Sequence, residues 1–277
     1  MGIESSEVMR IKEAAQRVRR RVIRMTYLAG SGHPGGSLSA TEIITCLYLK
    51  VLRHNPEDPG WHDRDRFILS KGHACPALYA VLAECGYIQE EELWTLRKLG
   101  SRLQGHPELN TVPGIDAPAG SEGQGLGIGC GMALAARLEG SQRRVYVMLG
   151  DGECDAGNTW ESALFAAHQK LDNLTAIIDR NRLQQDDECV RVLDTEPLAE
   201  KWRAFNWHVI EIDGHDISQI LDAFENARSN KGRPTMIVAR TIKGKGVSFM
   251  ENNVSFHGKP PNQEEYERAM RELGGNG

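Results

Sequence analysis

The stretch RVYVMLGDGECDAGNTWESALFAAHQKLDNLTAIIDRNRLQ, residues 144–184, carries the strongest signals of the fold. It contains two short apolar runs, 144–149 and 174–179, with a helical pattern between them. The first run leads into Gly-Asp-Gly and the second into Asp-Arg-Asn. Buried parallel strands joined by a helix have this pattern, and their carboxyl ends lie at one edge of the sheet. We therefore expect Asp151 and Asn181 to emerge close together.

The same alternation continues on both sides of this stretch. Strands are predicted at 66–70, 207–213 and 235–242. Helices are predicted at 5–29, 41–49, 76–86, 90–100, 123–140, 196–206 and 217–229. Apolar strands that alternate with helices indicate an α/β fold, in which helices cover both faces of a parallel sheet in three layers. We expect one domain over residues 1–277.

Composition excludes several classes of protein. The net charge of −5 gives no general attraction to nucleic acid or to anionic membranes, so we expect neither as a partner. The basic cluster at 17–21 fits an exposed helix face. None of the six cysteines forms a Cys-x-x-Cys pair, which argues against a zinc site or a disulfide framework, and most are expected to be small core residues. No signal peptide or membrane-spanning run is apparent, so a soluble cytoplasmic protein is expected.

The two strand ends also suggest a metal site. The carboxylate of Asp151 and the amide oxygen of Asn181 are hard ligands that suit Mg²⁺, with room left for phosphate oxygens and water. Gly150 and Gly152 allow the backbone to approach a diphosphate, and the following helix offers its N-terminus. A Gly-Asp-Gly sequence alone would equally fit a simple turn with a helix cap. The Asn-terminated strand about thirty residues later makes the metal site the more specific interpretation.

This pair of motifs resembles the thiamine-diphosphate motif, in which the Asp, the Asn and a carbonyl two residues beyond it hold the metal. That carbonyl would be the one of Leu183. Further segments resemble the transketolase family in order and spacing, and they are SGHPGGSLS (31–39), HNPEDPGWHDRDRFILSKGHACPALY (54–79), LGSRLQGHPE (99–108), GSEGQGLGIGCGMA (120–133) and TIKGKGVSFMENNVSFHGKPP (241–261). The resemblance covers nearly the whole chain and implies thiamine diphosphate with Mg²⁺, or Ca²⁺, as cofactors. It is closest to the N-terminal subunit of split transketolases.

The resemblance also assigns roles to four histidines in glycine-flanked loops. His33 and His257 would contact the sugar, with His257 also near the diphosphate. His106 would bind the donor ketose near its carbonyl end, and His73 would lie beside the cofactor phosphates. Imidazoles suit proton transfer at sugar hydroxyls, because their pKa lies near working pH. The other histidines are expected to be structural, and they are His54, His62, His168, His208 and His215.

The family's cofactor-ring loop corresponds to Gly120, Ser121 and Glu122. Lys243 and Lys245 could be anion partners or simply solvated lysines, and the sequence leaves both interpretations open.

Three residues depart from the family pattern. Glu122 stands where the family has a leucine that packs on the thiazolium ring, and its carboxylate would face that ring. Ala156 replaces a glutamate that helps to couple two active sites, and Arg182 replaces the glycine after the metal-binding asparagine. These changes leave the metal site intact but bear on cofactor affinity and activation.

By this resemblance, the chain is part of a transferase that moves a two-carbon ketol unit from a ketose phosphate to an aldose phosphate, as in the pentose phosphate pathway. The family's glutamate that activates the cofactor lies in a second domain, and the sequence ends at Gly277, just past the segment that leads out of the first. The resemblance therefore implies a partner chain with the pyrimidine-binding and C-terminal domains. The two chains would form a heterotetramer that is active only when both are present.

Two alternatives remain open. A related ketol transferase for a sulfo-sugar or a branched-sugar phosphate would look the same in this chain, because the residues that read the distal phosphate lie largely in the partner. A non-catalytic subunit that retained the fold is the other alternative, and Glu122 and Ala156 are what favours it. A 1-deoxyxylulose-5-phosphate synthase fits less well, because the SKGHACPALY and GHPE segments match transketolase better.

Overall fold

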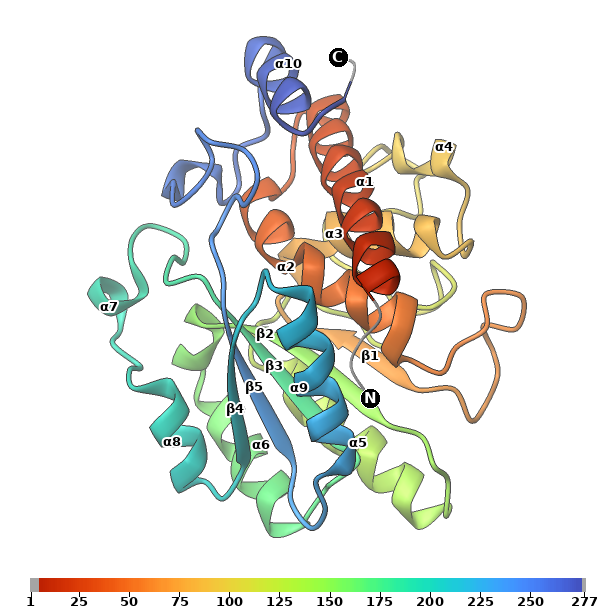
Figure 1. The fold of residues 1–277 in the computed structure, drawn as a ribbon, viewed down its shortest axis with the longest axis vertical. Coiled ribbons are helices and arrows are strands. Elements are labelled where there is room, and N and C mark those ends of the chain that lie inside the picture. The colour runs from red at the N-terminus through yellow and green to blue at the C-terminus, as the bar shows by residue number, and fades with distance from the viewer. Residues whose placement is uncertain (1–4, 276–277) are drawn as a thin grey trace.

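The computed structural model describes residues 5–275 and has one five-stranded parallel sheet at its centre (Figure 1). Its strands are β1 (Arg66–Leu69), β2 (Val145–Gly150), β3 (Leu174–Arg180), β4 (His208–Asp213) and β5 (Thr235–Arg240). They lie side by side in the order β1-β2-β3-β5-β4, and every pairing is parallel. All five were predicted, because each is a short apolar run between helical segments.

Helices cover both faces of the sheet and confirm the predicted three layers. In β2, Tyr146 and Met148 point into one core while Val145 and Val147 point into the other, because successive side chains of a strand face opposite ways. The first core is completed by α1 (Ser5–Ala29), α2 (Pro34–Cys46), α3 (Cys75–Glu84), α9 (Ile217–Ser229) and α10 (Gln263–Glu272). The second is completed by α5 (Gln124–Leu138), α6 (Gly157–His168) and α8 (Leu198–Ala204). In Figure 1, α9 lies across the front of the strands.

The register of the sheet brings three strand ends level. Gly150 at the end of β2 pairs with Asp179 of β3, and Asp179 pairs with Ala239 of β5. Since β5 lies between β3 and β4, segments far apart in the chain meet at this edge. The remaining short elements are η1 (Leu47–Val51), η2 (Gly72–Ala74), α4 (Glu90–Leu93), η3 (Gly152–Asp155), α7 (Cys189–Val192) and η4 (Val254–Phe256).

The predicted helices at 41–49 and 90–100 were only partly right. Helix α2 begins well before the predicted start, at Pro34, because proline fits the first helical turn, where its missing N–H has no helical acceptor. Its end continues into the π-helical turn η1. The second helix ends at Leu93, and Arg97 then adopts a φ of 59°, which a right-handed helix cannot contain.

The basic cluster at 17–21 is not an exposed face, because Arg17, Arg20 and Arg21 are half-buried and Val18 and Arg19 are buried. Arg19 is buried beneath the others, where it pairs with Glu42 and donates a hydrogen bond to the carbonyl of Lys245. The prediction of a solvated face was therefore wrong, because carboxylates compensate these arginines within the fold: Glu42 pairs with Arg19, and Glu84 pairs with Arg17 and Arg21. Five of the six cysteines are buried and Cys85 is partly so, all as free thiols, which confirms them as core residues. Within residues 5–275, no helix combines the length and apolarity that crossing a membrane requires.

Candidate active site

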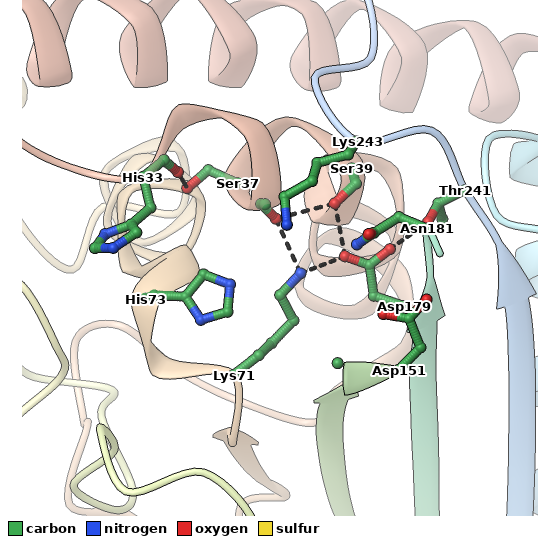
Figure 2. Close-up of polar contacts among 12 residues, drawn as sticks. His33, Ser37, Ser39, Lys71, His73, Asp151, Asp179, Asn181, Thr241 and Lys243 are labelled. Carbon is green, nitrogen blue, oxygen red and sulfur yellow. Dashed lines mark hydrogen bonds and ion pairs between the residues drawn. The ribbon is translucent and has the colours of Figure 1, made fainter. Parts of the chain in front are cut away.

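A buried ion pair lies at the carboxyl edge of the sheet. Asp179, the penultimate residue of β3, is fully buried and accepts hydrogen bonds from Lys71, from Thr241 and, at 2.6 Å, from the hydroxyl of Ser39 (Figure 2). Lys71 follows β1 and also donates to the carbonyl of Gly36 at 3.1 Å. Burial alone would raise the pKa of Asp179, but the charge of Lys71 holds it below the ordinary value. This pair fixes the ends of β1, β3 and β5 against α2.

The three predicted metal ligands lie together beside this ion pair. Asp151 is 4% exposed, and its two carboxylate oxygens accept the backbone N–H groups of Gly152 and Arg182. Asn181 Oδ1 accepts the N–H of Leu183 at 3.0 Å, and the carbonyl of Leu183 accepts a hydrogen bond from Lys243 Nζ at 2.8 Å. Within residues 5–275, Asp151 has no ion-pair partner of its own.

Burial, followed by the nearby Asp179, raises the pKa of Asp151 to about 6. A buried carboxylate without a partner, an amide oxygen and a backbone carbonyl make a donor set that fits a hard divalent cation.

All four glycine-flanked histidines line the same cavity of about 450 Å³, together with Asp151, Asn181 and Leu183. The ring centroid of His33 lies 5.4 Å from that of His73, 5.5 Å from that of His257 and 6.3 Å from that of His106. Burial, with Arg97 as the next cause, lowers the pKa of His33 to about 4, and burial with Lys243 lowers that of His257 to about 2. Both imidazoles are therefore neutral at pH 7.

The predicted cofactor loops divide between two cavities. Gly120, Glu122, Gly150 and Gly152 line the histidine cavity, whereas Ser121 lines a separate cavity of about 290 Å³ beside α5. The carboxylate of Glu122 lies 2.9 Å from His73 Nδ1, so it has a partner within the chain instead of an open position over a ring.

Three of the five histidines that were expected to be structural have hydrogen-bond partners away from this cavity. His54 bonds to Tyr48 and Tyr87, His208 to Asn226, and His215 to Glu42 and Ile242.

Four residues of this region were missed or left open by the sequence. They are Lys71, Asp179, Glu153 and Lys243, of which the first three were not singled out and the last was ambiguous. Lysine is almost never buried without a partner, so its identity alone gave no signal. A carboxylate inside the apolar run 174–179 was the available clue to Asp179. Glu153 is buried and accepts the N–H groups of Gly123 and Gly150, which holds the two glycine loops together.

The departures Arg182 and Ala156 have local explanations. Arg182 has a φ of 67°, a left-handed conformation that favours glycine, so an arginine there costs about 1 kcal/mol. Its N–H still reaches Asp151. Ala156 is the residue before α6 and packs so closely on Gly123 that a Cβ on that glycine would lie 2.6 Å from its own. Lys245, unlike Lys243, does not line the histidine cavity within the described part of the chain.

Comparison with known proteins identifies the family of the chain. The profile of the family described as "Transketolase, thiamine diphosphate binding domain" matches residues 11–277. The 6-deoxy-6-sulfo-D-fructose transketolase subunit SqwG of Clostridium sp. (strain MSTE9) is 42% identical over 269 residues, which are 97% of this chain and 98% of that protein. An apulose-4-phosphate transketolase subunit of Phocaeicola vulgatus is 40% identical over 273 residues, 99% of this chain and 95% of that protein.

Longer transketolases are similar over less than half of their length. The transketolase of Homo sapiens is 42% identical over 271 residues, which are 98% of this chain but 43% of that protein. The crystal structure of the Campylobacter jejuni transketolase superposes with a TM-score of 0.92 at 32% identity, covering 100% of this chain and 44% of that one.

The fold is thus that of a thiamine-diphosphate-binding domain. The chain belongs to the transketolase family, and it matches proteins named as transketolase subunits over nearly their full length.

Proposed function

We propose that this chain is the diphosphate-binding subunit of a split transketolase. The observation that carries the proposal is the position of Asp151, Asn181 and the Leu183 carbonyl in one cavity with four histidines and two buried lysines. The oxygen ligands suit a divalent cation, and the ammonium groups of Lys71 and Lys243 suit the diphosphate that the cation would bridge. The proposed domain spans residues 1–277, of which the structure describes 5–275.

The chain's own residues would bind and orient the reactants. Asp151, Asn181 and Leu183 would hold Mg²⁺ or Ca²⁺, while His73, Lys71 and Lys243 would face the diphosphate. When bound, thiamine diphosphate supplies the carbanion stabilisation that transfer of a two-carbon ketol unit requires. The neutral imidazoles of His33 and His257, with that of His106, would donate and accept hydrogen bonds at the sugar hydroxyls.

A partner chain is part of this proposal. Two relatives that match along nearly their whole length are named as subunits, which supports a second polypeptide carrying the pyrimidine-binding and C-terminal domains. Each complete enzyme would then be a heterotetramer acting on sugar phosphates, which fits a cytoplasmic location.

More than one class of sugar is a candidate substrate. One relative is named for a sulfo-sugar and another for apulose 4-phosphate, while the human transketolase is equally similar at 42% identity. A ketol transferase for a sulfo-sugar or a branched-sugar phosphate is therefore a candidate equal in sequence support to a pentose phosphate enzyme.

The test is reconstitution. The purified chain would be assayed for ketol transfer alone and with the polypeptide encoded beside it, using xylulose 5-phosphate, 6-deoxy-6-sulfo-fructose and apulose 4-phosphate as donors. We expect no turnover by the chain alone and turnover of one donor class with the partner. Turnover by the chain alone would contradict the split enzyme. Cofactor binding by the assembled pair without turnover of any donor would instead favour a non-catalytic subunit.

A further inference from the structure

Among the described residues that line the histidine cavity, Glu122 is the one carboxylate that contacts an imidazole. Its Oε1 lies 2.9 Å from Nδ1 of His73, while its side chain remains 43% exposed at the rim of the cavity. The side chain of His73 is only 12% exposed. The contact joins the loop before α5 to the turn after β1.

The two neighbouring imidazoles contact cationic side chains, whereas His73 contacts a carboxylate. Nδ1 of His257 lies 2.8 Å from the ammonium of Lys243, and Nδ1 of His33 lies 3.4 Å from the guanidinium of Arg97. Lysine and arginine can only donate hydrogen bonds, so each of these Nδ1 atoms accepts, and each ring carries its proton on Nε2.

At His73 the neighbouring carboxylate places the ring proton on the other nitrogen. Ionised Glu122 can only accept, so Nδ1 of His73 must donate, and the lone pair of that ring is left on Nε2. A Cβ placed on Gly36 would lie 3.0 Å from this Nε2 and 3.5 Å from Lys71 Nζ, so both nitrogens border the same space. His73 is therefore the one member of this trio whose free nitrogen can bind a proton.

The charges around His73 decide when that proton binds. Lys71 and Lys243, from the ends of β1 and β5, oppose a positive charge on the ring, and the neighbouring imidazoles of His33 and His257 oppose one only when they are themselves protonated. Asp179 and Glu122 favour one. Burial and then Lys71 hold the pKa of His73 well below its ordinary value in the ligand-free chain. A polyanion placed among these groups would offset the lysine charges and favour protonation.

We propose that Glu122 is a positioning residue that fixes the Nδ1–H tautomer of His73, so that binding of a diphosphate beside Lys71 is accompanied by uptake of one proton on His73 Nε2. The proton comes from solvent, and no other bond forms or breaks. The result is a carboxylate–imidazolium–phosphate chain, with Nδ1–H donating to Glu122 and Nε2–H to a phosphate oxygen. The identity of the diphosphate as that of the cofactor rests on the proposed function, whereas the tautomer does not.

The tautomer is tested first, without any ligand. Nitrogen NMR spectra of the full chain labelled with ¹⁵N-histidine would be recorded, with His73→Asn used to assign the signal of His73. We expect His73 as the Nδ1–H form in the wild type and as the Nε2–H form in Glu122→Leu. An Nε2–H form in the wild type, or no change in Glu122→Leu, would overturn the proposal whatever the chain's function.

Proton uptake is tested by calorimetric titration of magnesium thiamine diphosphate, and separately of magnesium pyrophosphate, in buffers of different ionisation enthalpy. The wild type should take up about one proton more than Glu122→Leu or His73→Asn, so its affinity should fall about tenfold more per pH unit above neutrality. The double variant should equal His73→Asn, and Glu225→Gln, an exposed glutamate on α9, should equal the wild type.

The outcomes separate the two proposals. Proton uptake with pyrophosphate but no binding of thiamine diphosphate would support the role of Glu122 and contradict the proposed function. Binding of either ligand with equal proton uptake in wild type and Glu122→Leu would overturn the role of Glu122 and leave the proposed function standing.

Discussion

The ends of β2 and β3 carry two buried aspartates that differ in one respect. Asp179 pairs with the buried ammonium of Lys71, whereas Asp151 accepts only backbone N–H groups and has no ion pair within the described residues. The pKa of the first is lowered, and that of the second is raised to about 6. The chain thus compensates one carboxylate internally, whereas the proposed function assigns the other to a cation from outside. In this proposal, one strand end serves stability and its neighbour serves binding.

The largest effect is expected when Lys71, the cation that compensates Asp179, is removed. Lys71→Met leaves Asp179 buried without its partner and should lower the free energy of unfolding by about 3–5 kcal/mol, because an uncompensated charge remains in the core. Urea unfolding would measure this. Adding Asp179→Asn to the same chain should recover much of the loss, and Lys245→Met, at a partly exposed lysine nearby, should change stability by less than about 0.5 kcal/mol. An unchanged unfolding free energy in Lys71→Met would show that the pair is not a structural element.

Removing the other aspartate should affect binding and spare the fold. Asp151→Ala should weaken Mg²⁺-dependent binding of thiamine diphosphate by about 100-fold or more, since even substitutions behind a metal ligand weaken binding 10–100-fold. The unfolding free energy of the ligand-free chain should not fall, because the variant loses a buried carboxylate that lacks an ion-pair partner. Calorimetric titration and urea unfolding would measure the two effects. Asp187→Ala, at a partly exposed aspartate of the loop after β3, is the matched control. Retention of the cofactor at wild-type affinity would refute the metal assignment.

The comparison extends to a basic side chain, His33, whose charged form is disfavoured by burial and by a neighbouring cation. Its pKa is lowered to about 4 by burial and by Arg97, from an ordinary value near 6.5. The folded chain therefore binds fewer protons than the unfolded chain between these values, so stability is full above pH 6.5 and declines as pH falls towards 4. Urea midpoints measured from pH 7.5 to 4.5 should decline less steeply in His33→Asn than in the wild type. The control His62→Asn, at a side chain that is 71% exposed, should follow the wild type. Parallel curves for His33→Asn and the wild type would contradict the assignment.

The smallest expected effect tests whether the buried carboxyl group of Asp179 is charged. Ser39 donates a 2.6 Å hydrogen bond to its carboxylate inside the core. Ser39→Ala should lower the free energy of unfolding by about 1.5–3 kcal/mol if the acceptor is charged, and by about 1 kcal/mol if it is neutral. A loss of about 1 kcal/mol or less would mean that the Lys71–Asp179 pair shares a proton and is not a full ion pair.

The sequence predicted the sheet well because four of its five strands are almost entirely buried, whereas the edge strand β4 is half-exposed. Residues 144–149 and 174–179 are mostly apolar, and β2 and β3 lie within one residue of those bounds. The helix predicted at 90–100 failed because a distant contact outweighs local propensity. Arg97 leaves the helical path to place its guanidinium on Ser31 and His33, which periodicity cannot reveal.

The candidate site was predictable where its residues end strands or lie in glycine loops. Asp151 and Asn181 were identified because parallel strand ends meet at one edge, and the four histidines because a family resemblance marked their loops. Lys71 and Lys243 were not, since burial of a lysine depends on a partner that only the folded chain brings near. The pairing of Glu122 with His73 was equally hidden, because the two lie 49 positions apart in the sequence.

The position of β5 between β3 and β4 has a consequence for synthesis of the chain. Asp151 and Asn181 leave the ribosome long before Lys243 and His257, and β4 has no neighbour in the sheet until β5 follows it. Until then β3 presents an unpaired edge, which is the kind of surface that promotes aggregation of nascent chains. Folding must therefore wait for distant segments, and parallel, non-local pairing is slow. The capacity to hold a ligand at this edge consequently appears last, so ligand binding would distinguish finished chains from those stalled after β4.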